Sequence, residues 1–259
     1  MKNTQTLSIA FLFLLILSSC GSNKIASSKQ SYKLVWSDEF NYKGSPDATK
    51  WNYELGGGGW GNNESQYYTN RPENVIVENG ILKIKSKKEE YMGSNYTSAR
   101  ILTKGKFSFQ YGKVEIRAKQ PAGGGTWPAL WMLGANVDTA GWPECGEIDI
   151  MEYAGNRPNI STCALHHPGH FGATPDMGNT TVSDAETQFH IYSLEWTPTE
   201  IKIFVDHQQF FTFVNSSSVP FNQDFFLIFN CAIGGGYGGA IDPNFTGSTF
   251  EIDYVRVYK

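Results

Sequence analysis

Basic residues are sparse in this chain, and its net charge is not concentrated in any run. Only 18% of the 259 residues are charged, and the formal net charge is −4. Proteins that bind nucleic acid usually carry a basic patch, which is absent from this sequence. We therefore expect no nucleic-acid partner.

Amphipathic helices are also missing, because no segment combines a sustained 3.6-residue apolar period with capping residues. Short runs of β-forming residues recur instead, separated by Gly, Pro and Asn. Residues 75–85 form a predicted hairpin on Asn79-Gly80, and residues 106–119 a strand pair or a bent strand broken at Gly112. Further strands are expected at 191–196, 201–205, 225–233 (buried on both faces) and 250–258. Many short strands with turn signals indicate an all-β sandwich or barrel.

Cysteine is scarce as well. Besides Cys20, the chain contains only Cys145, Cys163 and Cys231. An odd count in an exported protein leaves at least one thiol free, and a chain of this length buries enough surface to fold without disulfides. We expect these three side chains to be buried as small apolar residues.

No apolar run is long enough to cross a membrane as a helix. The run Leu7–Leu17 follows Lys2 and leads into Leu17-Ser18-Ser19-Cys20. This pattern resembles a bacterial lipoprotein box, in which the cysteine is lipidated; an ordinary signal peptide is the alternative. We expect a signal peptide over 1–19, a flexible tether over 20–32 and one domain over 33–259. The expected location is the cell envelope, lipid-anchored through Cys20 to a membrane, with the outer membrane favoured.

Carboxylates are concentrated in the stretch Gly146–Tyr153, where Glu147, Asp149 and Glu152 alternate with apolar residues. The Ile, Met and Tyr neighbours favour a half-buried strand, on which Glu147 and Asp149 share a face. Strict alternation would turn Glu152 to the opposite face. A β-bulge near Ile150-Met151 would bring Glu152 back beside the other two carboxylates.

Three carboxylates on one strand face are suited to acid–base catalysis. No basic residue lies between Asp138 and Arg157 to balance them, as a solvated acidic face would usually have. With the bulge, the two Glu carboxyl groups could approach to about 5–6 Å, close to the roughly 5–5.5 Å separation in retaining glycosidases. An exposed acidic strand is the alternative that the residues alone leave open.

The sequence Glu-Ile-Asp-Ile-Met-Glu resembles the Glu-x-Asp-x-x-Glu signature of glycoside hydrolase family 16, in the form carried by laminarinase-type endo-1,3-β-glucanases. Other blocks resemble the same family in its order: residues 34–40, 59–64, 97–100, 127–132 and 253–258. The resemblance implies a β-jelly-roll sandwich, concanavalin-like, with a concave substrate cleft. It also implies double displacement, with Glu147 as nucleophile, Glu152 as general acid and then base, and Asp149 hydrogen-bonded to Glu147.

The resemblance further implies substrate-binding roles for Asn63, Arg100, Trp127, Trp131, His166 and Asn230. Trp60, in a loop of four glycines, and Trp142, just ahead of Pro143, are hard to bury and are also expected to stack on sugar rings. Core packing is the alternative for Trp127 and Trp131, and a structural ion pair for Arg100. His166 is expected on the neighbouring strand near Glu152. The other tryptophans, Trp36, Trp51 and Trp196, are expected in the core.

Two parts of the sequence bear on metal binding. The segment His166–His170 matches no zinc spacing, and its acidic ligands would have to come from the catalytic strand, so no zinc site is predicted there. The resemblance implies a structural calcium ion at Glu39, Gly80 and Asp253, and no cofactor for catalysis. An unoccupied acidic spot is the alternative.

The sequence thus predicts a monomeric, retaining endo-1,3-β-glucanase that acts on laminarin-like β-glucan. A family 16 enzyme for mixed-linkage glucan or red-algal galactan is one alternative, since the bulged motif does not settle the substrate. The other is a non-catalytic β-glucan-binding lectin on the same fold. Such lectins usually lack one of the two glutamates, and both are present here.

Overall fold

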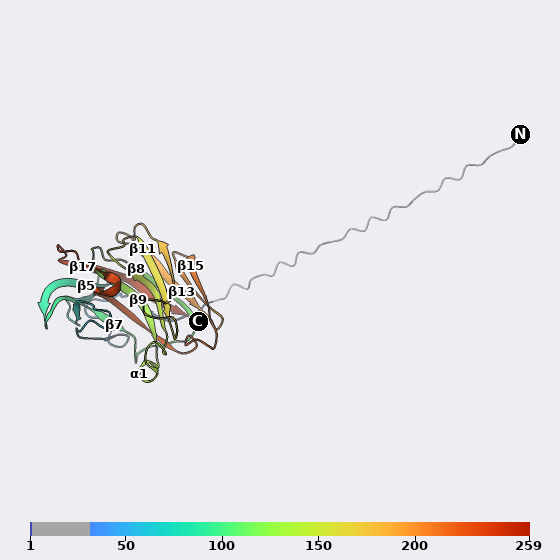
Figure 1. Cartoon of the computed structure of the whole chain (residues 1–259), viewed down its shortest axis with the longest axis horizontal. Coiled ribbons are helices and arrows are strands. Elements are labelled where there is room, and N and C mark those ends of the chain that lie inside the picture. Colours follow the sequence, from blue (N-terminus) through green and yellow to red (C-terminus); the bar gives the residue numbers. More distant parts are fainter. Residues whose placement is uncertain (2–31) are drawn as a thin grey trace. The chain divides into compact units, whose positions relative to one another are not determined.

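The computed structural model describes Met1 and residues 32–259 (Figure 1). The predicted signal peptide, Cys20 and nearly all of the tether therefore lie outside the described residues. Residues 32–259 form one compact unit. Among the residues described, no helix has the length and apolar character needed to cross a membrane.

Two β-sheets make up this unit. The larger sheet contains β1 (Leu34–Asp38), β3 (Gln66–Tyr68), β4 (Val75–Glu78), β5 (Ile81–Tyr91), β6 (Ser94–Ser98), β8 (Gly112–Lys119), β13 (His190–Trp196), β14 (Glu200–Val205), β15 (Gln208–Val214) and β17 (Gly247–Tyr258). The smaller sheet contains β2 (Asn52–Tyr53), β7 (Arg100–Leu102), β9 (Thr126–Gly134), β10 (Glu147–Tyr153), β11 (Ile160–His166), β12 (Asp176–Thr181) and β16 (Phe225–Ile233). In the described part of the chain, helix is limited to α1 (Val137–Ala140) and α2 (Gly235–Gly238).

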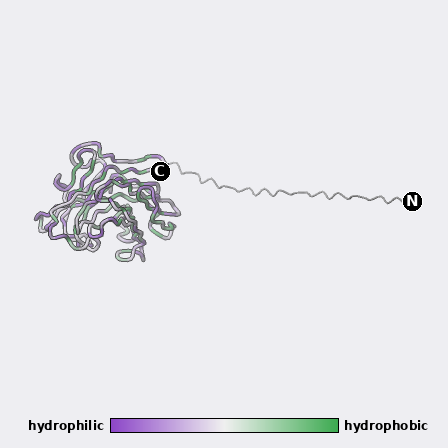
Figure 2. The backbone as a smooth tube through the Cα atoms, turned by 90° about the horizontal axis from the view of Figure 1, so that it is seen from above, coloured by the Kyte–Doolittle hydropathy of each residue, from purple (hydrophilic) through white to green (hydrophobic). Residues whose placement is uncertain are grey.

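The smaller sheet is antiparallel throughout, in the order β12-β11-β10-β9-β16-β7-β2. The larger sheet runs β15-β14-β13-β8-β17-β5-β6-β3, with β1 and β4 added on β17 and β5. The predicted all-β sandwich of the jelly-roll type is confirmed. Apolar and polar segments are interspersed along the backbone, as alternating strands require (Figure 2).

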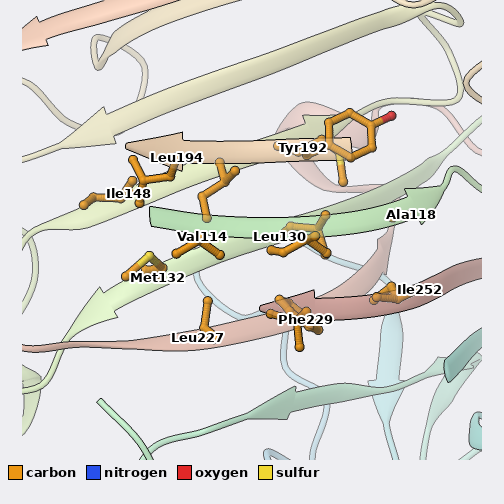
Figure 3. Packing of buried hydrophobic residues seen from close by; sticks show 14 of the residues in the cluster. Val114, Ala118, Leu130, Met132, Ile148, Tyr192, Leu194, Leu227, Phe229 and Ile252 are labelled. Carbon is orange, nitrogen blue, oxygen red and sulfur yellow. The ribbon is translucent and has the colours of Figure 1, made fainter. Parts of the chain in front are cut away.

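The core lies between the two sheets. Val114 and Ile252 of the larger sheet, and Leu130, Met132 and Leu227 of the smaller sheet, are all fully buried in one cluster (Figure 3). Every residue of β16 is buried, which confirms the prediction of a central strand. On the neighbouring strand β9, by contrast, Trp127, Trp131 and Leu133 are only half-buried, so the face of the smaller sheet that points away from the core is partly open there.

Several local predictions are confirmed. The hairpin at 75–85 forms with Asn79 and Gly80 at φ +56° and +77°, as a tight turn requires. Trp51 and Trp196 are buried in the core, whereas Trp36 is half-buried against it. The thiols of Cys145, Cys163 and Cys231 are buried and free.

The strand predicted over 106–119 is wrong in its first half. Only Gly112–Lys119 is a strand, and Phe109 makes a single isolated bridge to Phe225. Aromatic packing takes the place of the ladder: Phe107 stacks on Trp36 with ring centroids 4.8 Å apart. Gly112 then bends the chain at φ +129°.

Candidate active site

The acidic strand β10 is bulged where the sequence predicted. Its pairing with β11 shifts between Asp149 and Glu152, and its pairing with β9 shifts between Asp149 and Met151. Ile150 and Met151 are consecutive, yet both are fully buried in the core. Because two residues in a row face the core, Glu152 returns to the side of the sheet that carries Glu147 and Asp149.

The predicted polar and aromatic site residues mostly come from the same sheet. Its strands supply Arg100 on β7, Trp127 and Trp131 on β9, His166 on β11 and Asn230 on β16. On β9, Leu130 and Met132 point into the core, so the alternating Trp127 and Trp131 lie on the opposite face. The sheet thus gathers these side chains around β10.

An indole N–H donates to each of the two glutamates. Trp142 Nε1 lies 2.9 Å from Glu147 Oε2, and Trp127 Nε1 lies 2.9 Å from Glu152 Oε1. Trp142 is 44% exposed and Trp127 is half-buried. Both tryptophans therefore orient a carboxylate while keeping ring surface for contact with a ligand.

His166 contacts a different carboxylate from the one predicted. Its Nε2 lies 3.2 Å from Asp149 Oδ2 and 3.8 Å from Glu147 Oε1. His166 lies on the neighbouring strand as predicted, but the ladder pairs it with Glu147, whereas Glu152 pairs with Thr162. The charge of His166 nevertheless lowers the pKa of Glu152. The backbone N–H of Gly172 donates to His166 Nδ1 at 3.2 Å, so in the neutral ring the proton lies on Nε2, facing the carboxylates.

Burial raises the pKa of all three carboxyl groups. The pKa of Glu147 rises to about 8, chiefly through burial and then through repulsion by Asp149. The pKa of Asp149 is raised well above its ordinary value by burial and by Glu152, and burial also raises that of Glu152. Burial therefore favours the protonated forms of these carboxyl groups.

The predicted hydrogen bond between Asp149 and Glu147 is not found within residues 32–259. Asp149 is 4% exposed, and the polar neighbour of its buried Oδ2 is His166 Nε2 at 3.2 Å, a contact that lacks hydrogen-bond geometry. The two side chains interact instead through charge repulsion, which raises the pKa of Glu147.

Arg100 makes a structural ion pair and also contacts tryptophans of the predicted substrate site. Its Nε lies 2.5 Å from Glu54 Oε2, so the structural ion pair is present. Its guanidinium carbon also lies 5.0 Å from the ring of Trp60 and 4.7 Å from that of Trp131. The arginine therefore holds two predicted substrate-binding tryptophans by cation–π contact.

A hydrogen-bonded chain that sequence reasoning missed runs behind Trp131. Trp131 Nε1 donates to Asn230 Oδ1 at 2.7 Å, Asn230 Nδ2 donates to the Tyr68 hydroxyl at 3.0 Å, and that hydroxyl donates to Glu64 Oε2 at 3.1 Å. Asn230 is only 6% exposed, so its amide positions Trp131. Nothing in the alternation around Tyr68 distinguishes it from a core tyrosine.

Other predicted and unpredicted residues lie at the edges of the site. Trp60 is half-buried, with Nε1 donating to the Gly56 carbonyl at 3.1 Å, and Asn63 is exposed in the same loop. Tyr237 packs against Trp127 with ring centroids 5.4 Å apart, and Phe171 packs edge-on to Trp142 at 5.5 Å. The sequence did not predict Tyr237 and Phe171 because each lies far along the chain from the tryptophan that it contacts.

The residues of the predicted calcium site converge along β17. Asp38 pairs with Val255 and Leu82 pairs with Ile252, which brings Glu39, Gly80 and Asp253 to the same part of that strand. The carboxylate of Glu39 accepts two hydrogen bonds from Arg256, at 2.9 and 2.7 Å, and Asp253 lies 2.5 Å from Arg117. Both predicted carboxylate ligands are therefore already paired with an arginine.

Comparisons with known proteins converge on one group. The model of the glycosyl hydrolases family 16 matches residues 62–256. The chain is 46% identical to a beta-glucanase of Rhodothermus marinus, over 88% of this chain and 85% of that protein. It is 38% identical to a glucan endo-1,3-beta-glucosidase of Cryptopygus antarcticus, over 95% of this chain and 97% of that protein. The X-ray structure of the laminarinase from Rhodothermus marinus superposes with a TM-score of 0.85 at 46% identity, covering 88% of this chain and 98% of that one.

Proposed function

Because the chain belongs to glycoside hydrolase family 16, we propose that it is a retaining endo-1,3-β-glucanase that cleaves laminarin-like polysaccharide. The bulged strand β10 is the observation that carries this proposal. It presents Glu147 and Glu152 on one face, each oriented by an indole N–H. A pair of carboxyl groups flanking the scissile bond is what double displacement requires.

The two glutamates have different tasks. Glu147 attacks the anomeric carbon while Glu152 protonates the leaving oxygen; Glu152 then takes a proton from the water that hydrolyses the glycosyl-enzyme. The neighbouring His166 and the N–H of Trp142 lower the pKa of Glu147 against the effect of burial, which favours its ionised form. Burial keeps protons in the cluster, which supplies the acid.

Azide rescue tests this assignment. Glu147→Ala and Glu152→Ala should each lower activity on laminarin by at least ~10³-fold, because each removes a group needed for chemistry. With an activated aryl β-glucoside and azide, Glu147→Ala should give the inverted α-glycosyl azide. Glu152→Ala should give the retained β-glycosyl azide, because its nucleophile remains.

Glu144→Ala is the matched control, because Glu144 is exposed just before β10 and should be dispensable. Product stereochemistry read by NMR decides the roles. Swapped stereochemistry would exchange the two assignments, and substantial activity of either alanine variant without azide would end the double-displacement proposal.

The substrate is the finer part of the proposal. Rates of reducing-end release should be highest on laminarin, compared side by side with lichenan, agarose and carrageenan. A higher rate on lichenan or on either galactan would instead favour the mixed-linkage or galactan alternative. The presence of both glutamates on one face argues against a lectin.

We further propose that the chain acts as a monomer in the cell envelope, anchored through a lipidated Cys20. The support is the Leu17-Ser18-Ser19-Cys20 sequence. Cys20→Ala should release the protein from membranes or block its processing, while the rate of laminarin hydrolysis is unchanged. Unaltered membrane fractionation, with no lipid label on the wild type, would exclude the anchor.

A structural calcium ion is proposed at the convergence of Glu39, Gly80 and Asp253. Backbone carbonyl oxygens would hold it, because Arg256 and Arg117 already occupy the two carboxylates. The ion would supply structural cross-linking between β1, β17 and the β4–β5 turn. It has no part in the chemistry of the two glutamates.

A further inference from the structure

A second cluster of ligand-type side chains lies outside the carboxylate site. It consists of His167, His170 and Asp176, whose ligand atoms all lie within 4.8 Å of one another. His167 Nε2 is 2.9 Å and His170 Nδ1 is 3.1 Å from the same oxygen, Asp176 Oδ2. We propose that these three residues bind a zinc ion.

The two imidazoles are arranged side by side by the backbone. His167 and His170 exchange two backbone hydrogen bonds of 2.9 Å across the turn at Pro168-Gly169, where Gly169 has φ +87°. Their rings are nearly parallel, with centroids 4.9 Å apart and an interplanar angle of 12°. Because the turn fixes both side chains before an ion arrives, little ordering entropy opposes binding.

The surroundings suit a partly open metal site. His167 is 7% exposed and lies edge-on to Phe213 and Phe221, each with a ring centroid 5.6 Å away. The side chain of His170 is 55% exposed, which leaves the cluster open to water on one side. The acidic ligand comes from the start of β12, not from the catalytic strand that the sequence suggested as its source.

Two imidazole nitrogens and one carboxylate oxygen favour zinc over calcium or magnesium, which prefer oxygen ligands. Around a tetrahedral zinc ion with bonds of about 2.0–2.1 Å, neighbouring ligand atoms lie roughly 3.3 Å apart. The present separations of 2.9 and 3.1 Å need to expand only slightly. Water would complete the coordination on the open side.

The same loop contacts the active site. The N–H of Gly172 donates to His166, and Phe171 packs edge-on to Trp142, whose indole holds Glu147. An ion that joins His167 and His170 to Asp176 would therefore restrain the segment that positions His166 and Trp142. Its role is structural, because none of its three ligands contacts the reacting carboxylates.

Zinc titration of the purified, chelator-stripped chain tests the proposal. The wild type should bind one Zn²⁺ with a dissociation constant in the micromolar range or below, and binding should raise the melting temperature. His170→Asn should weaken binding at least about tenfold, since even second-shell substitutions have effects of that size. His170 is exposed, so this variant is expected to fold.

His207→Asn is the matched control, because His207 is an exposed histidine in the turn between β14 and β15. It should bind Zn²⁺ as the wild type does. Glu147→Gln should also bind normally, which separates this cluster from Glu147, Asp149 and His166, whose ligand atoms also lie close together. Equal affinities of wild type and His170→Asn, or loss of binding only in Glu147→Gln, would overturn the proposal.

Discussion

At the scale of single residues, burial raises the pKa of all three carboxyl groups of β10. The pKa of Glu147 is raised from 4.5 to about 8, so between these values the folded chain binds more protons than the unfolded chain. The free energy of unfolding must therefore fall as pH rises through this window. The raised pKa of Glu147 therefore lowers the free energy of unfolding at neutral and alkaline pH, a loss of stability of the kind that active sites commonly carry.

Replacing Glu147 with Gln should reveal this effect. Glu147→Gln removes the buried charge, so at pH 8 it should raise the free energy of unfolding by about 1–2 kcal/mol, with a smaller gain near pH 4.5. Activity on laminarin should be lost in the same protein. Urea unfolding at pH 4.5, 6 and 8 measures the difference.

Glu144→Gln serves as the control for that experiment, because Glu144 is exposed and its replacement should change stability little at any pH. If the stabilities of wild type and Glu147→Gln run parallel across the range, the pKa of Glu147 is not raised in the folded chain.

The clustering of Glu147, Asp149 and Glu152 on one face of a bulged strand could be predicted from the sequence, because three carboxylates within one apolar strand are chemically unusual. The contacts of His166 could not. Which carboxylate it faces depends on the pairing of β11 with β10, and that register is set by the intervening loop. The hydrogen bonds that link Trp131 through Asn230 and Tyr68 to Glu64 could not be predicted either, because these residues are far apart in sequence.

At the scale of secondary-structure elements, features determined by neighbouring residues could be predicted from the sequence. Features determined by residues far apart in the chain could not. The Asn79-Gly80 turn determines its hairpin through two neighbouring residues. The alternation of Phe107, Phe109 and Tyr111 suggested a strand, but aromatic packing satisfies the same pattern without a ladder. The position of β17 between β8 and β5 depends on strands over a hundred residues away.

The bulge in β10 gives the prediction at this scale. Relative to β9, Ile150 is the extra residue, since Asp149 pairs with Trp131 and Met151 with Leu130. Deleting Ile150 should leave Glu152 on the catalytic face and keep activity within about 100-fold of the wild type, the size of effect expected from a shift of roughly 1 Å. Loss of the buried side chain should lower stability by ~2–5 kcal/mol.

Ile150→Ala keeps the residue count and should be destabilised similarly, with activity near that of the wild type. Activity and urea unfolding are measured on both variants. If the deletion variant is as inactive as Glu152→Ala while Ile150→Ala has near-wild-type activity, the bulge is required for catalysis itself. Keeping Glu152 on the same face as Glu147 would then not be enough.

At the scale of the whole molecule, β17 joins the beginning and the end of the described domain. It pairs with β1, and the backbones of Lys33 and Lys259 exchange hydrogen bonds of 2.6 and 2.9 Å. The same strand pairs with β5 next to the β4–β5 turn. An ion bound at Glu39, Gly80 and Asp253 would cross-link these three segments, so its loss should be felt in global stability.

Calcium should therefore raise the melting temperature of the chelator-stripped protein. At calcium concentrations 100-fold above the dissociation constant, the expected rise is about 5–10 °C for a domain of this size. Asp253→Asn should keep part of this response if backbone carbonyls are the main ligands, because the Asp253 carboxylate is already paired with Arg117. His170→Asn should keep all of it, which distinguishes calcium from the zinc proposed at His167, His170 and Asp176. An unchanged melting temperature after chelation, with no rise on adding calcium, would mean that these carbonyls bind no ion and that the hydrogen bonds of β17 alone hold the two ends of the domain together.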